Sequence, residues 1–172
     1  VIIDNMMNLE LLEWASKNSD NSRFAAIARS HADVTLKNHF RADYSCWHVV
    51  SYDTITGQPE KKHTRQGYSH ESSWSRGEAW ALYGYVMMYR ETQQKHYLVH
   101  AKKVANYILT HPRMPEDGIP YWDYDAPDIP DTYRDASAGA IMASAFIELS
   151  TMIQGELSRK CLMMAETQLK TL

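Results

Sequence analysis

The sequence predicts an all-α fold made of three helical hairpins, and three observations support this. Three segments carry apolar or small residues at four-residue steps, which is the spacing of one helix face. Each of these segments follows another that is apolar over most of its circumference. The connections between them alternate between short and long. With 172 residues, of which 44% are hydrophobic, the chain can form one domain spanning residues 1–172 around a single core.

The first helix of each hairpin is expected to be an inner helix, buried on two sides, because apolar residues surround it. These helices are predicted at roughly Asp4 to Ser16, Trp74 to Thr92 and Arg134 to Met152. The second helices carry a repeated stripe of a large residue, two small ones and a leucine, which favours close packing against a neighbour. The stripes are Phe24, Ala28, Ala32 and Leu36; Tyr97, Ala101, Ala105 and Leu109; and Leu157, Cys161, Ala165 and Leu169. This is an internal repeat of helical hairpins.

The loop lengths predict where a functional site lies. Links from inner to outer helix are short, whereas the two links from outer to inner helix are long, at about 41–73 and 112–133. Both long loops therefore meet at the end where inner helices begin, and long loops on a rigid scaffold often carry function. Helix N-termini at that end also favour anions. Within the first loop, Val49 and Val50 predict a short strand paired near Lys62 to Thr64. Five of the six prolines lie in the second loop and predict a rigid segment.

Composition excludes several classes of partner. The formal net charge is −3 and there is no basic stripe, so nucleic acid is not expected to bind. No apolar run approaches a transmembrane length, so we expect no membrane partner. The two cysteines are far apart and form no CxxC motif, which argues against a metal site or a disulfide framework. No phosphate loop, dinucleotide fingerprint or nucleophile elbow is present. The start at Val1, without methionine, suggests a piece of a longer protein.

The heptad Trp-Ser-Arg-Gly-Glu-Ala-Trp at residues 74–80 is the strongest functional pattern. Arg76 and Trp80 are four residues apart and share one helix face. A guanidinium fork suits a carboxylate, and an indole face suits a sugar ring. Just upstream, Gln66 precedes Gly67 and is either a turn residue or a donor to a ligand. The pattern predicts a ligand with a carboxylate and a ring.

Two aspartates stand at equivalent places, at the starts of the first and third inner helices. Either could simply cap its helix. Asp4 lies among Ile2, Ile3 and methionines, so it could also be an acid/base whose pKa is tuned by burial. For Asp135 the sequence favours a cap, because Ala136 and Ser137 continue a typical helix start. His48, in the first long loop, is either structural or a ligand contact.

His96 and His100 have the four-residue spacing of a helical metal pair. The motif contains no glutamate and lies at the opposite end from the long loops. We therefore expect both histidines on the solvated surface and no metal site.

Six segments, in order along the chain, together resemble glycoside hydrolase family 88, the unsaturated glucuronyl hydrolases. They are Asp4 to Leu9, His48 to Asp53, Gln66 to Tyr68, Trp74 to Trp80, Asp117 to Asp123, and Arg134 to Ser137. The resemblance implies an (α/α)6 barrel, of which three hairpins are half. It also implies removal of a 4,5-unsaturated uronic acid from the non-reducing end of oligosaccharides, without metal or organic cofactor. The expected partner is an oligosaccharide that carries this unsaturated uronate.

The family mechanism implies roles for particular residues. Asp4 matches the acid/base that protonates C4 of the vinyl ether and activates water for C5. His48, Gln66, Arg76 and Trp80 match residues that line the unsaturated sugar and its carboxylate. The family's second active-site aspartate lies upstream of the segment matching Asp4, outside this chain, so we expect residues 1–172 alone to be inactive. Glu78 stands where glutamine is usual. It points away from Arg76 by helical spacing, so little effect on the site is expected.

Two alternatives remain open at this point. An unsaturated rhamnogalacturonyl hydrolase would use the same barrel and hydration chemistry, although the Asp-Asn-Met-Met and Gln-Gly-Tyr segments favour the glucuronyl type. A non-catalytic helical-repeat binding module would also be built from stacked hairpins.

Overall fold

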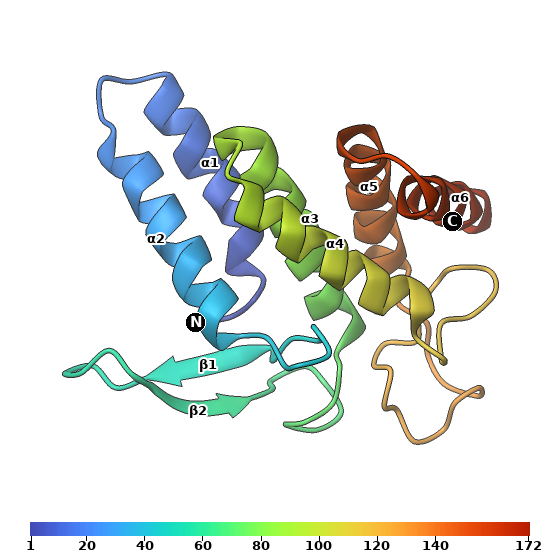
Figure 1. The fold of residues 1–172 in the computed structure, drawn as a ribbon. Coiled ribbons are helices and arrows are strands. Elements are labelled where there is room, and N and C mark those ends of the chain that lie inside the picture. The colour runs from blue at the N-terminus through green and yellow to red at the C-terminus, as the bar shows by residue number, and fades with distance from the viewer.

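The computed structural model describes all residues from Val1 to Leu172 and contains six helices and one two-stranded sheet (Figure 1). The three predicted hairpins are confirmed. The elements are α1 (Asn5–Lys17), α2 (Arg23–Asn38), β1 (Val49–Tyr52), β2 (Pro59–His63), α3 (Ser75–Thr92), α4 (Lys95–Thr110), α5 (Ala136–Met152) and α6 (Glu156–Thr171).

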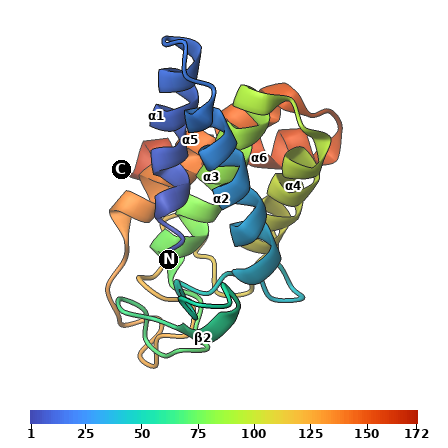
Figure 2. The same ribbon diagram turned by 90° about the vertical axis from the view of Figure 1, so that its left-hand side faces the viewer.

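The inner helices α1, α3 and α5 form a row in which α3 is central. It packs against α1, α4 and α5, while α2 and α6 pack on α1 and α5 respectively (Figures 1 and 2). The prediction that inner helices are buried on two sides holds for α3, whose apolar residues are largely buried. It is wrong for α1, which lies at one end of the row and leaves Leu11 and Trp14 exposed.

The small residues of the outer stripes lie in the core, as the sequence predicts. All six of these small residues are buried: Ala28, Ala32, Ala101, Ala105, Cys161 and Ala165. Their short side chains let α2, α4 and α6 approach the inner row closely. The exception along the stripes is Leu169, which is exposed near the end of α6.

The two α4 histidines do not share one environment. His96 is exposed and contacts Asp33 at 3.1 Å, as expected for a surface residue. The prediction is wrong for His100, which is buried against the rings of Phe40 and Tyr85, with centroids 4.1 and 4.6 Å away. Burial lowers the pKa of His100 to about 4. His100 lies three residues after the buried Tyr97 and four before the buried Val104, so it is on the inward side of α4. The spacing from His96 alone did not reveal this.

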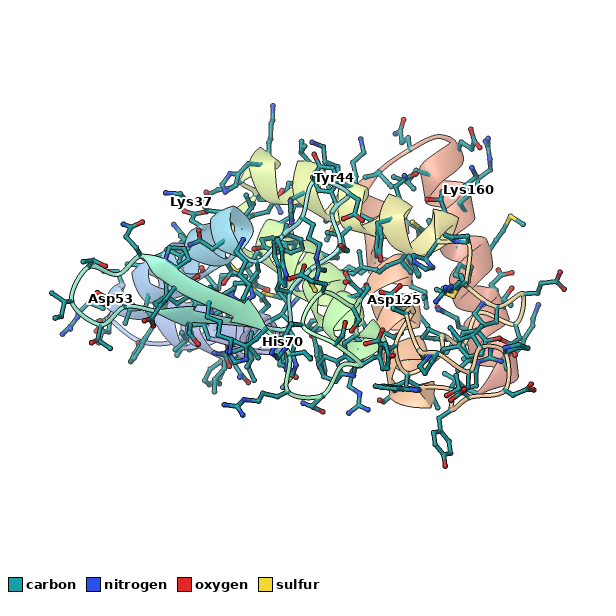
Figure 3. The ribbon with its side chains drawn as sticks, turned by 90° about the horizontal axis from the view of Figure 1, so that it is seen from below. Lys37, Tyr44, Asp53, His70, Asp125 and Lys160 are labelled. Atoms are coloured by element: carbon teal, nitrogen blue, oxygen red, sulfur yellow. The ribbon has the colours of Figure 1, made fainter.

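Both long loops lie at the end where α3 and α5 begin, below the helices in Figure 1. The predicted strand is confirmed, because Val49 pairs with His63 and Val50 with Lys62. The buried carboxylate of Asp123, in the second loop, ties the two loops together. Its Oδ2 accepts hydrogen bonds from the Tyr68 backbone N–H (2.8 Å) and the Ser72 hydroxyl (2.7 Å). Figure 3 views this end from below, with Asp53 in the hairpin and Asp125 in the second loop. None of the helices is long and apolar enough to cross a membrane.

Candidate functional site

The site begins with Asp4, which immediately precedes α1. The N-terminal residues pair with the start of β1, since Ile3 N–H donates to His48 O at 2.9 Å and Ile2 bridges to Val49. This pairing brings Asp4 next to His48. The Asp4 side chain makes no capping hydrogen bond to α1. Its Oδ2 atom is buried and has no hydrogen-bond partner. The capping alternative for Asp4 is therefore wrong, and this carboxyl oxygen is left without a hydrogen-bond partner in the protein.

His48 is held as a neutral imidazole that points its proton at Asp4. Its Nδ1 accepts the backbone N–H groups of Arg65 (3.2 Å) and Gln66 (3.4 Å), so this nitrogen carries no proton. The proton must then lie on Nε2, which is buried and 3.6 Å from Asp4 Oδ2. Burial lowers the pKa of His48, although the Asp4 carboxylate opposes this. At 3.6 Å the contact is longer than a hydrogen bond and is electrostatic.

An aromatic and a cationic side chain continue the site from His48 toward α5. The Trp74 ring stacks on His48, with centroids 4.4 Å apart and planes inclined by 35°. The Arg76 guanidinium lies 5.4 Å from the centre of the Trp74 ring. Arg76 then donates from Nε (3.0 Å) and Nη2 (2.9 Å) to Asp135 Oδ2. Side chains at the starts of all three inner helices are thus linked in one run of contacts.

Asp135 has a structural role, as the sequence favours. Its Oδ1 caps α5 by accepting the Ala138 N–H at 2.9 Å, and it also accepts the Ser137 hydroxyl at 2.5 Å. Burial opposes ionisation of Asp135, but the hydrogen bonds from Ser137 and Ala138, together with Arg76, outweigh it. They hold the pKa of Asp135 below its usual range. Asp135 is therefore an anion at neutral pH and holds the Arg76 guanidinium in place.

Trp80 lies one turn beyond Arg76 on α3 and lines a groove of about 440 Å³ between the three inner helices. The groove is lined by Met7, Asn8, Trp80, Tyr83, Ala140, Ile141 and Ser144. It begins one turn beyond Asp4 on α1 and one turn beyond Arg76 on α3, so it extends the site along the inner face. Two larger depressions, of about 530 Å³ beside α4 and about 540 Å³ on α2, contain none of the predicted site residues.

Gln66 joins the site through its backbone, which donates to His48. Its side chain is exposed to solvent and makes no hydrogen bond to the protein. No three histidine, cysteine, aspartate or glutamate side chains converge in a geometry that could hold a metal ion.

Three contributors to the site were not singled out from the sequence. Thr64 places its hydroxyl 3.2 Å from His48 Nδ1, Trp74 stacks on the same ring, and Asp123 ties the loops. Trp74 belongs to the heptad, so its residue type was a usable signal. Thr64 and Asp123 are ordinary loop residues, and only their contacts reveal their roles.

No family model matches the chain. A curated relative from Formosa agariphila, an unsaturated glucuronyl hydrolase, is 52% identical over 151 residues, which cover 88% of this chain and 38% of the relative. The chain belongs to the unsaturated glucuronyl hydrolase family. It spans under half the length of the curated relatives it matches.

Solved structures of unsaturated glucuronyl hydrolases share the fold. A heparin-specific unsaturated glucuronyl hydrolase superposes with a TM-score of 0.96 at 48% identity, over 99% of this chain and 46% of that one. A Streptococcus agalactiae aspartate-to-asparagine variant, complexed with the disaccharide dGlcA-GalNAc6S, superposes with a TM-score of 0.85 at 33% identity. The match covers 99% of this chain and 45% of that one. The three hairpins are therefore under half of an α/α barrel, as predicted.

Proposed function

We propose that the full-length gene product removes a 4,5-unsaturated uronic acid from the non-reducing end of oligosaccharides. One observation carries the proposal: a carboxyl oxygen of Asp4 is buried without a partner at the start of an inner helix, facing the Nε2–H of His48. A buried, unsatisfied carboxyl costs stability, so such a group is a strong candidate for chemistry rather than support. The family relationship supports the same reaction class.

In the proposed reaction, Asp4 acts first as an acid and then as a base. Its carboxyl protonates C4 of the C4=C5 vinyl ether, and the resulting carboxylate takes a proton from the water that adds at C5. The hemiketal formed at C5 opens to a ketone, C1 becomes a hemiacetal, and its collapse releases the aglycone. The Nε2–H of His48 faces the Asp4 carboxylate formed after the first step and stabilises that negative charge.

Arg76 and Trp80 are proposed to bind the unsaturated uronate. Arg76 donates hydrogen bonds from Nε and Nη2 to Asp135, whereas its Nη1 makes no hydrogen bond to the protein. The Arg76 side chain is 40% exposed. That remaining donor is proposed to hold the uronate carboxylate. The Trp80 indole lines the inner groove and offers an apolar face to the sugar ring. The exposed amide of Gln66 is proposed to bind a sugar hydroxyl.

The relatives favour this proposal over the two alternatives. These relatives are unsaturated glucuronyl or unsaturated chondroitin disaccharide hydrolases, not rhamnogalacturonyl hydrolases. A solved relative was also complexed with an unsaturated disaccharide. A helical-repeat scaffold would require neither the unsatisfied Asp4 carboxyl nor the neutral His48 aimed at it.

The test measures loss of the ultraviolet absorbance of the conjugated double bond when the full-length gene product meets an unsaturated glucuronyl disaccharide. Hydration of C4=C5 should abolish this absorbance and release the free aglycone. An unsaturated rhamnogalacturonyl disaccharide in parallel should react much more slowly. Residues 1–172 alone are expected to show no turnover. Equal rates on the two disaccharides, or none on the first, would overturn the proposal.

A further inference from the structure

Glu78 is a fully buried carboxyl that the proposed reaction does not use. It lies in the first turn of α3, two residues after the half-exposed Arg76, so the two side chains leave the helix in nearly opposite directions. The Glu78 side chain points away from the groove, toward the first long loop and α4. This matches the expectation that Glu78 points away from Arg76. On that side of α3, the role of the Glu78 carboxyl follows from its hydrogen bonds.

One oxygen of Glu78 joins two separate segments of the chain. Oε1 accepts the backbone N–H of Cys46 at 2.9 Å and the hydroxyl of Ser73 at 2.7 Å. The Ser73 hydroxyl in turn accepts the phenol O–H of Tyr107, on α4, at 2.9 Å. The other oxygen, Oε2, is buried and has no partner. Glu78 thus works as an acceptor for two donors rather than as one half of an ion pair.

Both of these segments lead directly into the site. Cys46 is two residues before His48, whose Nε2 faces Asp4. Ser73 is adjacent to Trp74, which stacks on His48. The spacing between Cys46 and Ser73 therefore sets how His48 meets Trp74.

We infer that Glu78 is a positioning residue: by accepting from both Cys46 and Ser73, it holds the His48 segment in register with the segment carrying Trp74 and Arg76. The inference rests on the proposed function for its catalytic consequence. Its structural core, the two hydrogen bonds to one buried oxygen, does not depend on the substrate.

The surroundings of Glu78 favour the protonated carboxyl. The titratable groups that face it are Arg41 and Cys46 from the segment after α2, Tyr107 from α4, and Tyr124 from the second long loop. Only Arg41 among them is a cation, and it donates instead to Ser45 Oγ, Cys46 O and Ser72 O. Burial therefore raises the pKa of Glu78 to about 7, although the bonds from Cys46 and Ser73 oppose this.

Because the pKa of Glu78 is raised, the alignment of the His48 and Trp74 segments should weaken as pH rises. The stability that Glu78 contributes is complete below its ordinary pKa of 4.5 and is lost as pH rises through about 7. Above that pH the buried, uncompensated charge of Glu78 weakens the site. Activity should therefore fall on the alkaline side of the pH profile as Glu78 ionises.

The experiment compares Glu78→Gln and Glu78→Leu in the full-length gene product. Glutamine keeps a carbonyl oxygen for both donors and cannot ionise. It should therefore match the parent kcat/KM at pH values below 7 and keep that activity at higher pH, where the parent declines. Leucine removes both bonds and should lower kcat/KM by roughly tenfold to a hundredfold, because the site geometry loosens. The matched control is Glu13→Leu, since Glu13 is another buried glutamate but pairs with Arg29 near the other end of α1.

A merely structural role is separated by measuring each variant at a temperature where circular dichroism shows it folded. Glu13→Leu should lower the melting temperature with kcat/KM and its pH profile unchanged. Nitrogen-15 NMR of the His48 imidazole should shift in Glu78→Leu and not in Glu13→Leu, whether or not the protein turns over the disaccharide. Parent kcat/KM, pH profile and His48 shifts in folded Glu78→Leu would overturn the positioning role. An inactive parent whose His48 shifts still respond to Glu78→Leu would overturn only the proposed function.

Discussion

The starts of α1 and α5 look alike in sequence and differ in the folded chain. Each begins with an aspartate at the loop end of an inner helix. Asp135 is saturated, because it accepts from Ala138 N–H, the Ser137 hydroxyl and two Arg76 donors. Asp4 accepts no hydrogen bond from its helix, and its Oδ2 has no partner. A carboxyl that is satisfied everywhere is locked as an anion and supports its neighbours, whereas an unsatisfied one is available to exchange a proton.

The difference arises from what each helix start meets. Asp135 faces Arg76 across the α3–α5 contact, and its own backbone turns so that Oδ1 reaches Ala138. Asp4 keeps helical backbone angles (φ −55°, ψ −30°), which direct its side chain away from the first-turn N–H groups and toward His48. The same residue type therefore serves as a cap in one place and as a candidate acid in the other.

The most direct way to break this comparison is Asp4→Asn in the full-length gene product. Asparagine cannot protonate C4, so kcat should fall by roughly a hundredfold to ten-thousandfold. The free energy of unfolding should change by less than about 1 kcal/mol, since no capping bond is lost. The measurement is the rate of absorbance loss beside a denaturation curve. An unchanged rate would show that Asp4 is not the acid.

Asp135→Ala tests the other side of the comparison and should act first on stability. Losing the cap and the anchor of Arg76 should lower the free energy of unfolding by about 2 kcal/mol. Because the pKa of Asp135 is lowered, its contribution is present above the ordinary value of 3.8 and is lost as pH falls through the folded value. Denaturation at a series of pH values should show parent and variant converging in acid. A constant difference at all pH values would contradict the anionic role.

Arg76→Lys sharpens the contrast by keeping the charge and removing the fork. A lysine cannot hold Asp135 with two donors and also reach a uronate, so KM should rise about tenfold with a smaller change in kcat. Arg90→Lys is the matched control, because Arg90 is also a multidentate arginine on α3 but bonds Glu148 and Glu91 at the far end. It should alter stability and leave KM unchanged. A KM increase of equal size in both variants would remove the special role of Arg76.

Thr64→Val should have the smallest effect and tests how His48 is held. The threonine hydroxyl lies 3.2 Å from His48 Nδ1, but two backbone N–H groups already fix that nitrogen. We expect kcat to fall only a few-fold, equivalent to about 1 kcal/mol. Kinetics with the unsaturated disaccharide measure this directly. A loss as large as that of Asp4→Asn would mean that the hydroxyl, rather than the backbone, sets the histidine tautomer.

Residue patterns alone predict the helices, their pairing and the end at which both long loops meet. Four-residue stripes of small residues record a helix face directly, and loop lengths constrain which helix ends meet. Residue type and position made Asp4, His48, Gln66, Arg76 and Trp80 candidates, and the resemblance to the family implied their roles. In the structure, the side chains of Asp4, His48 and Arg76 lie at the end of the molecule where the inner helices begin, and Trp80 lines the adjoining groove. Gln66 contacts this site through its backbone N–H, which donates to His48.

Which polar groups find hydrogen-bond partners depends on contacts that form in the folded chain. Asp4 and Asp135 are the same residue type at equivalent helix starts, and the neighbouring residues favour a cap only for Asp135. His100 is separated from His96 by one helical turn. Each pair diverges because hydrogen bonding and burial depend on neighbours far away in the chain, such as Arg76 for Asp135 and Phe40 for His100. Glu78 shows the same limit. Helical spacing directed it away from Arg76, but only the folded contacts with Cys46 and Ser73 link it to the site.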